Sequence, residues 1–70
     1  MEKRVGEYAI ITAVTIVPFP SAIAMHRGTA YVHEGSGAGP IVHTAVYEGV
    51  EGEDVQLRAL ERAEVWLESH

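Results

Sequence analysis

Two runs of β-branched, aromatic and polar residues flank a glycine-rich segment near the middle of the chain. The runs cover residues 29–34 and 40–47, and the segment between them, 35–39, reads Gly-Ser-Gly-Ala-Gly. Alternation of side-chain character over a short run is typical of strands, and glycine supplies the positive φ that a tight reversal needs. The pattern therefore predicts a β-hairpin at the centre of the fold.

Counting outward from this turn sorts the hairpin side chains onto two faces. Glu34 would pair with Pro40, and further along Tyr31 would lie opposite His43. Because side chains alternate across a strand, one face is aliphatic and is the expected core face. It carries Ala30, Val32, Val42, Thr44 and Val46. The aromatic and histidine-rich face carries Arg27, Thr29, Tyr31, His33, Ile41, His43, Ala45 and Tyr47. A slip of one residue in the turn would exchange neighbours across the hairpin.

A β-branched run without charged residues, from Tyr8 to Val17, predicts a strand before the hairpin. Both of its faces are apolar enough to be buried. One helix covers only one face of a sheet, so such a strand in a short chain needs a second cover. The run therefore favours self-association.

Residues 18–28 fit two structures. Pro18 and Pro20 cannot donate to a strand ladder, so they end the preceding strand. The stretch after them fits a second strand with Gly28 at a bulge. It also fits a two-turn helix with Ser21 as its N-cap and Gly28 as its stop. We favour the strand, because it matches the first strand in length and gives a simple meander.

The last part of the chain has the period of an amphipathic helix. Residues 48–52 form a short linker, and Glu53 or Asp54 would begin the helix with negative charge at the positive end of its dipole. Leu57 and Val65 lie off the apolar stripe. The stripe carries Val55, Ala59, Ala63, Trp66 and Leu67, with Leu60 at its margin.

These elements predict a small α+β domain. The expected fold is a three-stranded antiparallel β-meander followed by one C-terminal amphipathic helix, in the order β-β-β-α. The alternative is β-α-β-β-α, with a short helix at residues 21–27. Residues 1–70 form a single domain in this interpretation, with residues 1–7 as a frayed lead-in.

Composition removes several kinds of chemistry. The 70 residues include no cysteine, which excludes disulfides, thiolate zinc sites and cysteine nucleophiles. The absence of cysteine fits a cytoplasmic protein, and the apolar run at 9–17 is too short to span a bilayer. We therefore expect no membrane association.

The net charge of −5 is concentrated in the last third of the chain. Acids and bases balance up to Tyr47, whereas from Glu48 onward seven acids face Arg58 and Arg62. Phosphate backbones repel such a surface, which argues against nucleic acid as a partner. A basic surface on another protein is the expected partner instead.

The aromatic face and the glycine loop are the candidate binding site. Aromatic rings with adjacent polar tips are common on binding surfaces, and successive loop amides can cradle an anion. No His-x-x-x-His spacing exists, so we expect no metal, no cofactor and no catalytic residue. The candidate residues are Arg27, Tyr31, His33, Gly35, Ser36, Gly37, Gly39, His43 and Tyr47.

The sequence thus favours a non-enzymatic binding protein that acts as a homo-oligomer. The first hypothesis is a protein–protein interaction module that inhibits or regulates a basic partner. One alternative is a protein that binds or sequesters a small anionic ligand or nucleotide at subunit junctions. The other is an enzyme whose active site is shared between subunits.

The end of the helix resembles the last helix of small β3α modules. Residues 59–68 read Ala-Leu-Glu-Arg-Ala-Glu-Val-Trp-Leu-Glu. This stretch is similar to the DNA-binding arm domains of tyrosine integrases and to the HicB-type antitoxins. The acidic charge departs from the integrase arms, and the resemblance covers only this helix, so no function is carried over.

Overall fold

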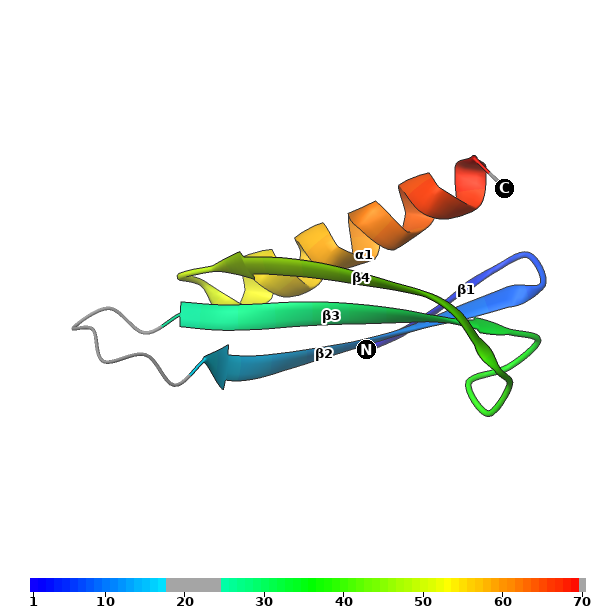
Figure 1. Ribbon diagram of the computed structural model, residues 1–70, viewed down its shortest axis with the longest axis horizontal. Helices are drawn as coiled ribbons and strands as arrows, with labels where there is room; N and C mark the ends of the chain where they lie inside the picture. Colours follow the sequence, from blue (N-terminus) through cyan, green and yellow to red (C-terminus); the bar gives the residue numbers. More distant parts are fainter. Residues whose placement is uncertain (18–24, 70) are drawn as a thin grey trace.

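In the described part of the chain, four antiparallel strands form one sheet, and a C-terminal helix lies across one of its faces (Figure 1). The structure is a computed structural model, and it describes residues 1–17 and 25–69. The sheet order is β1-β2-β3-β4, so each strand pairs with its neighbours in the sequence. The elements are β1 (Glu2–Val5), β2 (Tyr8–Val17), β3 (Met25–Glu34), β4 (Ile41–Gly49) and α1 (Gly52–Glu68).

The predicted three-stranded meander is wrong, because the sheet has a fourth strand at its N-terminal edge. Residues 2–5, expected to be frayed, form β1 and pair with the start of β2. A two-residue turn joins the strands, and its first residue, Gly6, has a φ of 58°. Glycine at this position is typical of the hairpin turns whose twist matches that of the flanking strands.

The third strand, β3, begins at Met25. Residues 25–27 of the alternative short helix are therefore strand instead. The rest of that helix, residues 21–24, lies outside the described residues. Gly28 pairs with Val14 on one side and Tyr47 on the other, in regular register and not at a bulge.

A β-bulge shifts the register of the β3–β4 hairpin. The turn itself is as predicted: the Glu34 N–H donates to the Pro40 carbonyl at 2.9 Å. Beyond it, Val42 is an extra residue, so that His43 lies opposite Val32. The predicted pairing of Tyr31 with His43 is therefore wrong, and Tyr31 lies opposite Thr44. One extra residue on one strand exchanges the faces of all later residues on that strand.

The shift also corrects the predicted core face. Ala30 and Val32 are fully buried beneath α1, as expected. Val42 and Val46 instead lie on the opposite face and are 39% and 41% exposed. His43 and Tyr47 take their place on the helix side, with Ala45 between them.

The helix agrees with the predicted period. Leu57 and Val65, expected off the apolar stripe, are 50% and 60% exposed. The buried residues of α1 are Val55, Ala59, Leu60 and Ala63. The core that they form with the sheet also contains Ile10, Ala30, Val32 and Ala45.

Small residues let α1 lie very close to the sheet. A Cβ on Gly28 would overlap the backbone carbonyl of Val55 in the first turns of the helix. Further along, Ala59 and Ala63 of the helix and Ala30 of β3 are fully buried at the same contact. The short distance between α1 and the sheet thus depends on residues that have little or no side chain.

One buried polar residue joins three elements. Thr12 of β2 is buried, and its hydroxyl accepts a hydrogen bond from the Gln56 amide of α1 at 2.8 Å. The same hydroxyl lies 3.4 Å from the carbonyl of Met1, to which it can donate. These bonds satisfy the Thr12 hydroxyl, which would otherwise destabilise the core.

Within the described residues, the structure contains no helix with the length and apolar character needed to cross a membrane.

Candidate functional site

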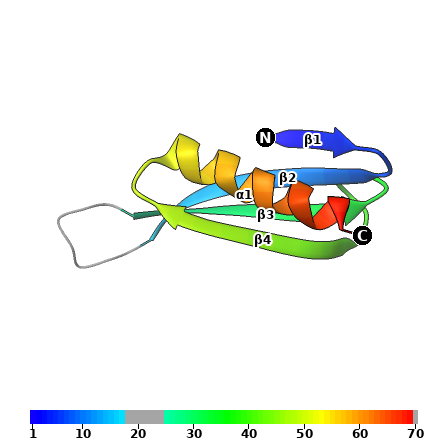
Figure 2. The ribbon, with the colours of Figure 1, turned by 90° about the horizontal axis from the view of Figure 1, so that it is seen from above.

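The sheet face opposite α1 has no covering element among the described residues (Figures 1 and 2). We call this surface the open face. The strand registers place side chains from β2, β3 and β4 on it. They are Ala9, Ile11, Ala13, Thr15, Val17, Arg27, Thr29, Tyr31, His33, Ile41, Thr44, Val46 and Glu48, together with the bulge residue Val42, which precedes the helix-side residue His43.

The middle of the open face is apolar and uncharged. Tyr31 lies at its centre, between Ile11 on β2 and Thr44 on β4. Val42 and Val46 flank Thr44 on the same face and are among the exposed large hydrophobic residues. Contiguous apolar surface of this kind marks interaction sites.

The charges on the open face lie at its margins and compensate one another. Arg27 and Glu48 form an ion pair with an N–O distance of 2.9 Å. On β1, the register places one acid and one base, Glu2 and Arg4, on the same face. The Arg4 guanidinium donates to the carbonyl of Gly35. The face is therefore close to neutral, although the chain carries a net charge of −5.

The glycine loop, residues 35–39, forms hydrogen bonds within the chain through its backbone N–H groups. Gly35 has a φ of 84°, and its N–H donates to the Glu7 carbonyl at 2.8 Å. The N–H of Gly39 donates to the Ser36 carbonyl at 2.8 Å. A Cβ on Gly39 would overlap the carbonyl of Glu34, so the chain passes itself closely here. Glycine at these positions serves the turn.

Two further loop amides are also engaged. The N–H of Ser36 donates to the Glu34 carbonyl at 3.1 Å, and that of Ala38 approaches the Ser36 hydroxyl at 3.3 Å. His33 Nδ1 lies 2.8 Å from the Gly39 carbonyl, which it can reach as a donor. These contacts use the groups that an anion would need.

The bulge divides the predicted aromatic face between the two sides of the sheet. Arg27, Tyr31 and His33 lie on the open face, whereas His43 and Tyr47 lie under the helix. His33 and His43 are thus on opposite faces of the sheet. Among the described residues, no group of three His, Asp or Glu side chains could hold a metal ion.

Beneath the helix, His43 and Tyr47 hold α1 against β4. The His43 ring stacks on Trp66 with a centroid separation of 4.4 Å and an interplanar angle of 4°. The guanidinium carbons of Arg58 and Arg62 lie 5.7 and 5.0 Å from the centroid of the Tyr47 ring. Cations at this distance are attracted by the ring face.

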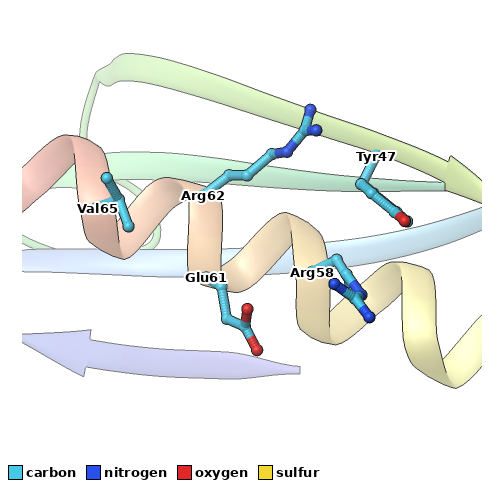
Figure 3. A pocket seen from close by; sticks show the side chains of 5 residues that line it. All are labelled: Tyr47, Arg58, Glu61, Arg62 and Val65. Carbon is cyan, nitrogen blue, oxygen red and sulfur yellow. The ribbon is translucent and has the colours of Figure 1, made fainter.

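Around Tyr47 there is an open hollow of about 310 Å³ (Figure 3). Arg62 Nη1 donates to the Val46 carbonyl at 2.8 Å. Arg58 Nε donates to Asp54 at 3.3 Å, and this hydrogen bond raises the pKa of Arg58. The hollow is lined by Tyr47, Arg58, Glu61, Arg62 and Val65.

The sequence interpretation missed the contacts of Tyr47 with Arg58 and Arg62. The signal was the spacing of Arg58 and Arg62, one helical turn apart. Its meaning depended on Tyr47 lying on the helix side, which the bulge decides.

No protein-family model matches this chain, and searches of curated proteins and of solved structures find no match. The function is therefore inferred from the surfaces described above.

Proposed function

We propose that this chain is a non-enzymatic binding protein that assembles with itself through the open face. The observation that carries the proposal is an apolar sheet face over which no described residue forms a helix. Antiparallel sheets often expose one face to water, but the side chains on that face are then mostly polar. Here Ile11, Tyr31, Val42 and Val46 occupy those positions.

A second copy of the chain suits this face for electrostatic reasons. The charged residues on the face compensate one another, so two copies would not repel each other there. On the outer surface of α1, by contrast, five acids accompany two arginines, so two such surfaces would repel each other. Stacked faces would therefore place the acidic helices outward.

The dimensions of the face suit a small stable interface. Strands of about ten residues at ~3.3 Å per residue, spaced ~4.8 Å apart, give roughly 500–600 Å² of flat area. Side chains corrugate such a surface, which raises the accessible area toward the ~800 Å² per partner of a standard interface. Two sheets stacked in this way form a sandwich with a shared apolar core.

A charge placed in the centre of the open face should separate the copies. We expect Tyr31→Glu to lower the solution mass measured by light scattering, because the carboxylate would be buried without a partner. The matched control is Leu57→Glu, which adds the same charge at an exposed apolar residue of α1. An unchanged mass for Tyr31→Glu, or an equal loss in both variants, would contradict the role of the open face.

The outward acidic helices would then bind a basic partner protein, which this chain would inhibit or regulate. Glu53, Glu61 and Glu68 are exposed acids of α1, and no ion pair engages them among the described residues. Their charge would speed encounter with a basic protein and select it over acidic ones.

Binding of a lysine-rich peptide tests this second surface. We expect an affinity that falls roughly tenfold as ionic strength rises from ~0.05 to ~0.3 M, because exposed charges are screened over this range. The combined variant E53Q/E61Q/E68Q should bind weakly at both salt concentrations while keeping the wild-type solution mass. Binding that ignores both salt and the three substitutions would contradict the proposal.

The small-anion alternative from the sequence is not favoured by the contacts of the glycine loop. Four of the five amides of the glycine loop and the Arg27 side chain already bond within the chain, which leaves few donors for a small anion. The alternative of an enzyme with a shared active site stays a prediction.

A further inference from the structure

The outer edge of β2 is paired along only part of its length. β1 pairs with β2 as far as Ile11, and the Thr12 N–H then donates to the carbonyl of Met1 at 2.9 Å. β1 lies beside only the first part of β2 in Figure 2. Beyond it, among the described residues, no strand lies beside residues 13–17 on that side. We call these five residues the β2 edge.

The backbone hydrogen bonds of Thr12 indicate which residues of the β2 edge direct their N–H and C=O groups away from β3. Both its N–H and its carbonyl face Met1, so its backbone groups point away from β3. In an antiparallel strand the backbone groups of successive residues point alternately to the two sides. The N–H and C=O groups of Val14 and Ile16 therefore also point outward, whereas those of Thr15 bond to β3.

The other edge of the sheet is protected against strand addition, whereas no such device protects the β2 edge among residues 1–17 and 25–69. On β4 the guanidinium of Arg62 occupies the Val46 carbonyl, Glu48 adds a charge, and the bulge at Val42 interrupts the strand. Proteins use such devices to block edge pairing. The β2 edge reads Ala-Val-Thr-Ile-Val, with no charge, glycine or proline, and Ile16 is 69% exposed.

We propose that the β2 edge pairs with the same edge of a second copy of this chain, antiparallel about a two-fold axis at Thr15. Val14 would lie opposite Ile16 of the second copy, and Thr15 opposite its own equivalent. The outward groups of Val14 and Ile16 then make four hydrogen bonds across the axis. An uncharged segment of β-branched residues is self-complementary in this arrangement, since Val–Ile and Thr–Thr cross-strand pairs both stabilise sheets.

This contact goes beyond the proposed function and does not require it. Edge pairing joins two sheets into one of eight strands, with both helices on one side and both open faces on the other. If the open faces also stack, the two contacts are related by perpendicular two-fold axes and the assembly closes at four chains. Closed tetramers of this symmetry are common among homo-oligomers.

Ile16→Pro tests the edge with little cost to the fold. Proline removes the outward N–H and places its ring on the free edge, where no ladder bond to β3 is lost. The matched control is Ile16→Ala, which removes most of the side chain and keeps the N–H. We expect Ile16→Pro to halve the wild-type mass and Ile16→Ala to keep it. An unchanged mass for folded Ile16→Pro, or an equal loss in both variants, would overturn the proposal.

The combination with Tyr31→Glu separates this proposal from the open-face contact. Tyr31→Glu alone should leave a pair of chains joined at the β2 edge, and adding Ile16→Pro should give a single chain of 7.6 kDa. If Tyr31→Glu alone gives single chains, the edge proposal is overturned. If Tyr31→Glu changes nothing while Ile16→Pro gives single chains, the edge stands and the open-face contact fails.

Hydrogen exchange gives a readout that needs no variant. In the isolated fold the amides of Val14 and Ile16 face solvent and should exchange quickly, whereas that of Thr15 is protected by β3. Edge pairing predicts slow exchange at all three positions in the concentrated protein. Fast exchange at Val14 and Ile16 would overturn the proposal.

Discussion

Gly28→Ala is expected to lower the free energy of unfolding by about 3 kcal/mol, a large share of the stability of a 70-residue domain. The added Cβ would overlap the carbonyl of Val55, which is backbone and cannot rotate away. The helix must therefore lift from the sheet or tilt, which opens gaps around Ala59 and Ala30. Urea unfolding followed by circular dichroism measures the change.

Gly52→Ala is the matched control for this substitution. A Cβ at Gly52 would meet His26 and Val14 side-chain atoms at 3.5 and 3.7 Å, which is ordinary contact. The position lies in the first turn of α1, where alanine is the better helix former, so we expect no loss of stability. Equal stability of Gly28→Ala and wild type would mean that α1 does not pass so close to β3.

Trp66→Ala is expected to cost about 2–3 kcal/mol. The indole packs against the core and stacks on the ring of His43, so its removal takes away both buried apolar area and the stack. The estimate lies below the usual range for a large aromatic residue because Trp66 is only half-buried. The loss should appear as a lower urea midpoint.

Val65→Ala provides the comparison for Trp66→Ala. Val65 precedes Trp66 on α1 but is 60% exposed, so its truncation should change the unfolding free energy by no more than ~0.5 kcal/mol. A loss in Val65→Ala as large as that in Trp66→Ala would show that α1 is rotated relative to the sheet.

The helix and the turn of the β3–β4 hairpin could be predicted from the sequence because each has a strong local signal. The period of Val55, Ala59 and Ala63 identifies the buried face of α1, and these residues are buried. The glycines at 35 and 39 locate the turn, and the Glu34–Pro40 hydrogen bond closes it.

The first strand could not be recognised in the same way. Residues 2–5 read Glu-Lys-Arg-Val, which lacks the alternation of a buried strand. Short, charged strands are what sheet edges use to avoid pairing with other chains, so such a strand resembles a disordered terminus in the sequence. Its signal was Gly6, at the first position of a two-residue turn.

The sequence predicted the residues that β3 contributes to the candidate site, but not those that β4 contributes. The alternation within β3 placed Tyr31 and His33 together, and the structure agrees. Their partners on β4 depended on whether Val42 was a paired or an extra residue. Valine fits either position, so the sequence does not encode the choice locally, and one residue moved His43 and Tyr47 to the other face.

The sequence predicted that both faces of β2 would be covered, because both are apolar. The structure places α1 over one of them, and none of the elements in the described part of the chain covers the face with Ala13, Thr15 and Val17. Where the paired edge of β2 ends could not be read from the sequence, because it depends on the length of a strand that was not predicted.

The most direct test of self-assembly is the mass of the unmodified chain in solution, measured by light scattering at micromolar concentration. We expect a defined multiple of 7.6 kDa: two chains if one surface associates, and four if the open face and the β2 edge both do. A mass of 7.6 kDa that persists as the concentration rises would contradict this expectation, because both proposed contacts would then be absent.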